Sequence, residues 1–136
     1  MRFVIALCLV AFSLSSIASA QTTPPVTGQL SPSDCQFYQG LIDVLDVAAA
    51  NQQPVIDAAR ASWVAKVNEG LAASMALYAA YASGELWLVP TLQAQCVTLG
   101  AQEAALYQEL MAAKALMMQI QQRRAEHVAA MTAGGC

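Results

Sequence analysis

Apolar side chains recur at three- and four-residue intervals along most of the chain after residue 31, the spacing of one face of an α-helix. A first helix is predicted from Pro32 to Gln52, because Ser31 can cap it and Asp34 suits the positive end of the helix dipole. Its apolar face contains Cys35, Tyr38, Leu41, Ile42, Leu45 and Ala49.

Pro54 cannot donate a helical hydrogen bond and fits the first position of a new helix, so we expect a turn before it. The second helix should continue to about Ser83, where Gly84 is a suitable C-terminal cap. The candidates for its inward face are Ile56, Ala59, Trp63, Val67, Leu71, Met75 and Tyr78.

A third, long helix is predicted from Glu85 or Pro90 to about Met131. Its apolar residues alternate steps of four and three, apart from Glu103 at one position of the stripe, which is typical of helices that pack nearly parallel. They are Leu92, Cys96, Leu99, Leu106, Leu110, Ala113, Met117 and Ile120. The predicted fold is an all-α, elongated three-helix antiparallel bundle over residues 32–131.

The first twenty residues have the composition of an export signal. Arg2 precedes an uncharged apolar run, and Ala18-Ser19-Ala20 is the small-residue pattern behind which signal peptidases cut. We therefore expect a signal peptide over residues 1–20, cleavage after Ala20, and a periplasmic or secreted mature protein. A Pro/Thr-rich extended arm over residues 21–31 and a flexible tail over residues 132–136 should flank the bundle.

Three cysteines follow the predicted signal peptide, so one pair and one leftover thiol are expected outside the cytoplasm. With a turn at Pro54 and a rise of 1.5 Å per residue, Cys35 and Cys96 come out at about the same height, roughly 25 Å below that turn. This predicts a disulfide between Cys35 and Cys96. Cys136 follows two glycines at the chain end and is predicted to remain untethered.

The same arithmetic leaves the hairpin between the second and third helices projecting beyond the first. Its end carries a concentration of large apolar side chains, which we predict as a partner-binding site because exposed patches of this kind are uncommon without a purpose. The site consists of Tyr78, Tyr81, Leu86, Trp87, Leu88 and Val89. The alternative is that the arm over residues 21–30 folds over this tip. The other overhang, at the end of the third helix, could pair with a second copy.

Composition and charge argue against several functions. Nine acidic and six basic residues give a net charge of −3 without a long basic run, which disfavours nucleic-acid binding. Residues 70–102 carry only one charge, Glu85, but are too weakly apolar for a membrane hairpin, so peripheral contact is the expected limit. The single histidine, His127, belongs to no nucleophile motif, and we expect it on a solvated helix end. No catalytic residue, metal ligand or cofactor is proposed.

Two short segments resemble known families. Residues 123–127 resemble the Arg-x-Ala-x-His end of periplasmic four-helix b-type cytochromes, which implies a haem ligand at His127, but the early methionine of that family is missing. Residues 54–59, Pro-Val-Ile-Asp-Ala-Ala, are similar to a segment of the minor-pilus subunits of type IV secretion systems. This second resemblance implies an exported, elongated helical subunit.

We therefore expect a non-enzymatic interaction or structural protein of the cell envelope, as a subunit or accessory factor of an envelope or secretion assembly, with a protein partner. The alternative is a helical module that binds a small ligand, haem or a metal. Such a module should have an internal pocket around Met75, Tyr78, Leu92 and Leu99.

Overall fold

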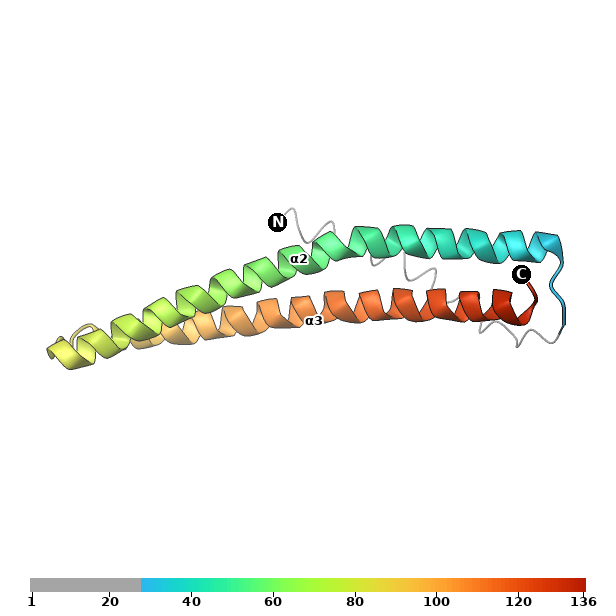
Figure 1. The fold of residues 1–136 in the computed structure, drawn as a ribbon. Helices are drawn as coiled ribbons and strands as arrows, with labels where there is room; N and C mark the ends of the chain where they lie inside the picture. The colour runs from blue at the N-terminus through green and yellow to red at the C-terminus, as the bar shows by residue number, and fades with distance from the viewer. Residues whose placement is uncertain (1–27) are drawn as a thin grey trace.

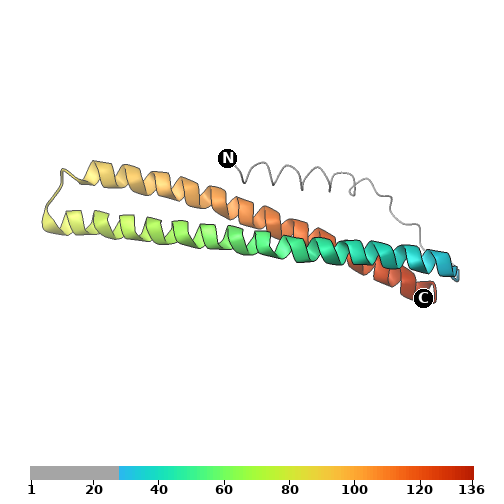
Figure 2. The same ribbon diagram turned by 90° about the horizontal axis from the view of Figure 1, so that it is seen from above.

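A computed structural model describes residues 28–136, which form a long antiparallel hairpin of two helices (Figure 1). α2 comprises Pro32–Ser83 and α3 comprises Val89–Ala133, and residues 84–88 connect them. The two helices lie side by side along their whole length, and they cross in the view from above (Figure 2). The prediction of an all-α fold with a long C-terminal helix is confirmed for the described residues, whereas the prediction of three helices is wrong.

The start of α2 agrees with the sequence. The Ser31 side chain accepts a hydrogen bond from the Asp34 backbone N–H, and the Asp34 carboxylate accepts one from the Ser31 backbone N–H. This reciprocal pair satisfies two backbone donors that have no partner inside the helix. It also holds the pKa of Asp34 below its usual value, mainly through the hydrogen bond from the Ser31 hydroxyl.

Pro54 lies inside α2 and does not end it. A proline inside a helix removes one helical hydrogen bond and kinks or breaks the helix, at a cost of roughly 3 kcal/mol. Here no glycine is near, and the buried side chains of Gln52 and Ile56 lie on both sides of the proline. Figure 1 shows α2 changing direction in its middle part without a break.

The interface between the helices is a regular seam with alternating steps of three and four. In α2 none of the seam residues is exposed, and the α3 stripe predicted from the sequence is confirmed, including the half-buried Glu103. The α2 seam consists of Cys35, Tyr38, Ile42, Leu45, Ala49, Gln52, Ile56, Ala59, Trp63, Lys66, Gly70, Ala73, Leu77 and Ala80. Such a seven-residue repeat is the pattern of a coiled coil.

The inward face predicted for the second half of α2 is only partly correct. Ile56, Ala59 and Trp63 lie in the seam, but Leu71 and Met75 are exposed. The predicted positions from Trp63 to Met75 are spaced by four residues, and each such step turns 400°, which is 40° more than a full turn. Successive residues therefore rotate away from α3, and the seam passes instead through Gly70, Ala73 and Leu77.

The prediction of a Cys35–Cys96 disulfide is also wrong. The structure joins Cys35 to Cys136, with Cα atoms 5.9 Å apart, and leaves Cys96 as a free, half-buried thiol. Because α2 is continuous, Cys35 lies level with the end of α3, and Cys96 is 40 residues, or about 60 Å, away along that helix. Cys136 is consequently tied to the start of α2 instead of being an untethered thiol.

The predicted signal peptide and residues 21–27 of the predicted arm lie outside the described residues. Residues 28–31 lie across the end of α3, where the Leu30 backbone N–H donates to the Gly134 carbonyl at 2.9 Å. A Cβ atom at position 134 would collide with the Leu30 side chain, so glycine is required for this close approach. Together with the Cys35–Cys136 disulfide, the hydrogen bond between Leu30 and Gly134 holds the start of α2 against the end of α3.

Candidate functional site

The hairpin tip is a tight connection built on Gly84. Gly84 adopts a left-handed conformation, with φ of 76°, which a side chain would disfavour, and the Glu85 N–H donates to the Ala80 carbonyl at 3.0 Å. The connection turns Leu86 and Trp87 outward, and they are 62% and 76% exposed, whereas Leu88 and Val89 are half-buried at the start of α3.

The two predicted tyrosines belong to the side of α2 and not to the turn itself. Tyr78 is 75% exposed, and the Tyr81 hydroxyl accepts a hydrogen bond of 3.2 Å from the Gln93 side chain of α3. The structure therefore divides the six predicted partner-binding residues into two groups. Leu86 and Trp87, with Leu88 and Val89, form the tip, and Tyr78 and Tyr81 lie beside it.

The N-terminal arm cannot cover the tip in the way that the sequence suggested. Residue 31 is at the disulfide end, and the 52 residues of α2 separate it from the tip by about 78 Å. Ten extended residues span at most about 36 Å. An arm consisting of residues 21–30 can therefore reach only about half of the distance to the tip.

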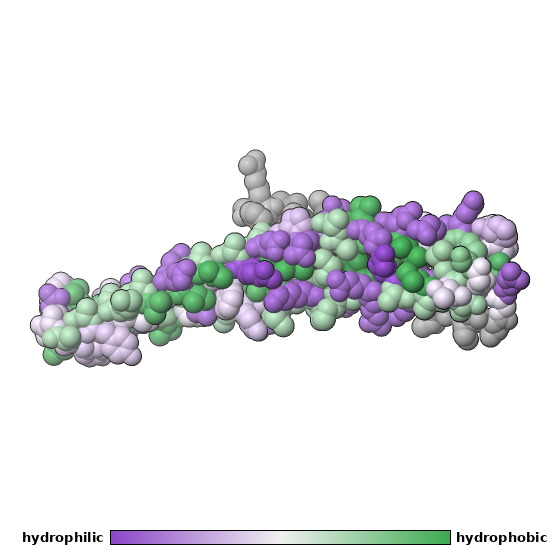
Figure 3. Space-filling view, in the orientation of Figure 1, coloured by the Kyte–Doolittle hydropathy of each residue, from purple (hydrophilic) through white to green (hydrophobic). Residues whose placement is uncertain are grey.

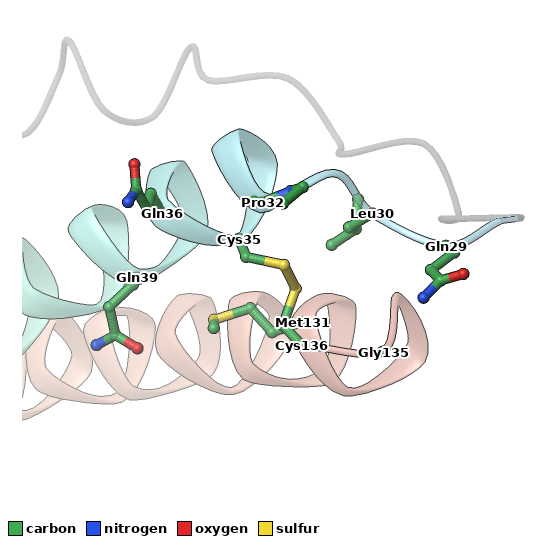
Figure 4. A pocket seen from close by; sticks show the side chains of 9 residues that line it. All are labelled: Gln29, Leu30, Pro32, Cys35, Gln36, Gln39, Met131, Gly135 and Cys136. Atoms are coloured by element: carbon green, nitrogen blue, oxygen red, sulfur yellow. A yellow bond between two sulfur atoms is a disulfide. The ribbon is translucent and has the colours of Figure 1, made fainter.

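Two hollows lie at the disulfide end. The larger, of about 540 Å³, surrounds the Cys35–Cys136 bond (Figure 4) and has no titratable side chain in its lining. The second hollow lies beside the ion pair of Arg124 and Asp46, whose Nη2 and Oδ2 atoms are 3.3 Å apart. The hydrogen bond to Asp46 raises the pKa of Arg124, so the guanidinium group remains charged at any ordinary pH. The lining of the larger hollow is Gln29, Leu30, Pro32, Cys35, Gln36, Gln39, Met131, Gly135 and Cys136.

The internal pocket expected for a ligand carrier does not form where the sequence placed it. Leu92 and Leu99 lie in the seam, but Met75 and Tyr78 are exposed on the outside of α2. Two of the four predicted lining residues therefore face solvent.

His127 is not a solvated helix-end residue. Its ring lies in the seam with its centroid 5.8 Å from that of Tyr38, and its Nδ1 atom is buried without a hydrogen-bond partner among residues 28–136. The reason is that α2 extends beside the end of α3, which the three-helix arrangement left uncovered. Within residues 28–136, no three His, Cys, Asp or Glu side chains come together in a way that could hold a metal ion.

No helix among the described residues is both long and apolar enough to cross a membrane. Both helices are nonetheless unusually rich in exposed apolar side chains. Figure 3 shows apolar surface in both halves of the hairpin, interrupted by hydrophilic surface.

One continuous apolar surface was not predicted from the sequence. On both helices it consists of the residues that directly follow the seam residues. Because α2 and α3 are antiparallel, the residue after each seam residue faces the same side of the hairpin on both helices. We call it the tip flank. It consists of Val64, Val67, Leu71, Tyr78 and Tyr81, with the adjacent Met75, from α2, and Val97, Gly100, Ala104 and Tyr107 from α3. The signal that could have revealed it is the seven-residue repeat of Val64, Leu71 and Tyr78.

Contacts between the helices agree with this placement. The hydrogen bond from Gln93 to Tyr81 joins the two stripes, and the Tyr107 ring lies 5.7 Å from that of Trp63. In the disulfide half, the same stripe of α2 is polar and contains Asp43, Asp46 and Asp57. On α2 the apolar character of this stripe is therefore confined to the half that ends in the tip, whereas on α3 the stripe continues into the disulfide half with the exposed Met111, Met118 and Val128.

Comparisons with protein-family models, with curated proteins and with solved structures find no match to this chain.

Proposed function

We propose that this chain is an exported helical protein that acts through protein contacts in the cell envelope, as a structural subunit or accessory factor of an envelope or secretion assembly. The observation that carries this proposal is the exposed pair Leu86 and Trp87 at the end of a rod about 75 Å long. An exposed tryptophan is among the residues that contribute most to protein interfaces when a partner pocket desolvates it.

The shape of the hairpin supports the same function. A rod clamped by a disulfide at one end presents its tip far from that end, where a partner can be reached without steric interference from the remainder of the chain. The tip needs little reorganisation on binding, because Gly84 and the backbone hydrogen bonds of residues 84–88 already fix the turn. A preformed turn lowers the entropic cost of association. The partner chemistry that fits is an apolar pocket large enough for one indole ring.

The test is a comparison of Trp87→Ala with Phe37→Ala. Phe37 is 63% exposed at the opposite end, so it is a control of similar chemistry outside the proposed site. In capture from envelope extract, Trp87→Ala should lose the partner, by about thirtyfold in affinity or more, whereas Phe37→Ala should retain it. Neither substitution should change the melting temperature by more than a few degrees.

Two outcomes would contradict the proposal. If Trp87→Ala retains every captured partner, the tip is not the contact. If the purified protein instead floats with lipid vesicles, and Trp87→Ala alone abolishes this, the tip binds a membrane surface and not a protein.

A further inference from the structure

We propose that two copies of this chain pair through their tip flanks, with the two α2 helices antiparallel, to form a four-helix assembly. Three observations carry this inference: the distribution of the hairpin's own core, the order of side chains along the flank, and the area available. The inference concerns a surface beside the tip and does not depend on the partner proposed for Trp87.

The core of the isolated hairpin is unevenly distributed. The five large buried apolar side chains lie in the half nearer the disulfide or at its boundary, whereas the only buried apolar side chains toward the tip are Ala73 and Ala80. Gly70 further thins the seam there. The five are Ile42, Leu45, Ile56, Leu110 and Ile120. The tip half therefore has no fully buried large apolar side chain: Leu77, Leu92, Leu99 and Leu106 are only half-buried in its seam, and further large apolar side chains lie on its flank and face solvent.

As a monomer, this half of the hairpin gains less from apolar burial than the disulfide half does. Burying one Leu, Val or Met side chain contributes about 1.5–3 kcal/mol, and the flank exposes several of them, including Leu71 at 61% and Met75 at 64%. A partner that covers the flank would bury these side chains and add to the half-buried apolar contacts of the seam. Most soluble oligomers use the same patch on both copies around a two-fold axis, which requires a patch complementary to itself.

The order of residues on the α2 flank meets this requirement. The flank positions of α2 begin with Arg60 and end with Tyr81, and Glu85 follows in the connection beyond Gly84; no charged residue stands on the flank positions between Arg60 and Glu85. In an antiparallel pair centred between residues 72 and 73, Arg60 of one copy lies near the connection that carries Glu85 of the other, twice in the dimer. The same alignment places Val64 opposite Tyr81 and Val67 opposite Tyr78, so that large rings meet smaller β-branched side chains. Leu71 then lies opposite Ser74 near the axis.

The area of the flank is sufficient for a specific dimer. The flank positions of α2 from Arg60 to Tyr81 cover 21 residue steps, or about 32 Å, and two adjacent helices are about 20 Å wide. This gives roughly 640 Å² per copy, or about 1,300 Å² in total, which is within the range of stable protein interfaces. The small side chains of Gly100 and Ala104 allow a second copy to approach closely.

Molar mass measured by sedimentation or light scattering, over micromolar to near-millimolar concentrations, tests the proposal. The wild-type protein should be a dimer. Leu71→Glu should shift it to a monomer by weakening association more than about a hundredfold, because two carboxylates would be buried near the axis. The matched control is Val47→Glu, since Val47 is equally exposed, at 62%, but lies in the disulfide half outside the flank. It should remain a dimer.

A charge exchange tests the antiparallel register. Arg60→Glu alone should weaken the dimer by about tenfold, since it replaces two attractions with two repulsions at a solvent-exposed rim. The double substitution Arg60→Glu/Glu85→Arg should restore wild-type association. Circular dichroism of each variant shows that the hairpin still forms.

The proposal is overturned if the wild type is monomeric throughout this concentration range, or if Leu71→Glu leaves the mass unchanged. Failure of the double substitution to restore association overturns the antiparallel register. A covalent dimer through Cys96 on a non-reducing denaturing gel, with no dimer in a Cys96→Ser variant, also contradicts it. Trp87→Ala should leave the mass unchanged, so failure at the tip and failure at the flank are distinguishable.

Discussion

Removal of the Cys35–Cys136 disulfide should strongly destabilise the hairpin. The bond closes a loop across a sequence separation of 101 residues. In the chain-entropy model, a loop of this length restricts the unfolded chain by about 16 cal/mol/K, which corresponds to about 4.7 kcal/mol at 25 °C. For a domain of about one hundred residues this loss lowers the melting temperature by roughly 20 °C.

The assay is thermal unfolding followed by circular dichroism for the wild type and for the Cys35→Ser/Cys136→Ser double variant, at equal protein concentration. Cys96→Ser is the control, because Cys96 is free and its substitution leaves the loop closed. Cys96→Ser should lower the melting temperature far less than the double substitution does. A peptide map of the oxidised protein should link Cys35 with Cys136. Equal melting temperatures for the wild type and the double variant would refute the reasoning, and so would a map that links Cys35 with Cys96.

Three further substitutions test how α2 and the seam are stabilised. Pro54→Ala should raise the free energy of unfolding by about 1–3 kcal/mol, measured by urea denaturation, because it restores a helical hydrogen bond; a decrease would show that packing depends on the kink. Glu103→Leu should raise the melting temperature because it removes a half-buried carboxylate from the seam, and a lower value would indicate that this carboxylate has an essential partner. Asp34→Ala should lower the melting temperature near neutral pH. Because the pKa of Asp34 is depressed in the folded state, its contribution is present above the usual carboxyl pKa and is lost as the pH falls through the depressed value. The two melting curves should therefore converge once the pH falls below the depressed pKa, and a difference that persists there would contradict this role of the carboxylate.

The sequence predicts the helical class, the first cap and the seam of α3, because these depend on local spacing alone. The sequence misleads at Pro54, because the rule that a proline starts a new helix competes there with the seven-residue apolar repeat, which continues on both sides of the proline. Ala49, Ile56 and Trp63 are spaced by seven residues through the proline, and this unbroken phase is evidence for a single helix. The sequence also does not predict that Gln52, two residues before the proline, lies in the seam. Its buried side chain is accommodated there because it donates a hydrogen bond of 3.0 Å to the Ala113 carbonyl.

The errors in the cysteine pairing and in the tip's surroundings follow from this one proline. With a turn at Pro54, Cys35 falls level with Cys96, and both the tip and the end of the C-terminal helix project without a neighbour. With a continuous α2, Cys35 meets Cys136, and α3 has a partner helix along its whole length. The expectation that the end of the C-terminal helix pairs with a second copy consequently loses its structural reason. The candidate tip keeps its exposure, because Gly84 and the connection after it depend only on local sequence.

The two ends of the hairpin differ in how they are held together, and this difference supports the assignment of contacts to the tip half. The disulfide end has a covalent link, the larger buried side chains and an ion pair between Arg124 and Asp46. The tip half has no cross-link, its fully buried apolar residues are Ala73 and Ala80, and several of its large apolar side chains lie on the flank. A chain that needed only a stable rod would bury those side chains between its own helices. Their position on one flank, between Arg60 and Glu85, is what a surface requires if its contacts are completed by another chain.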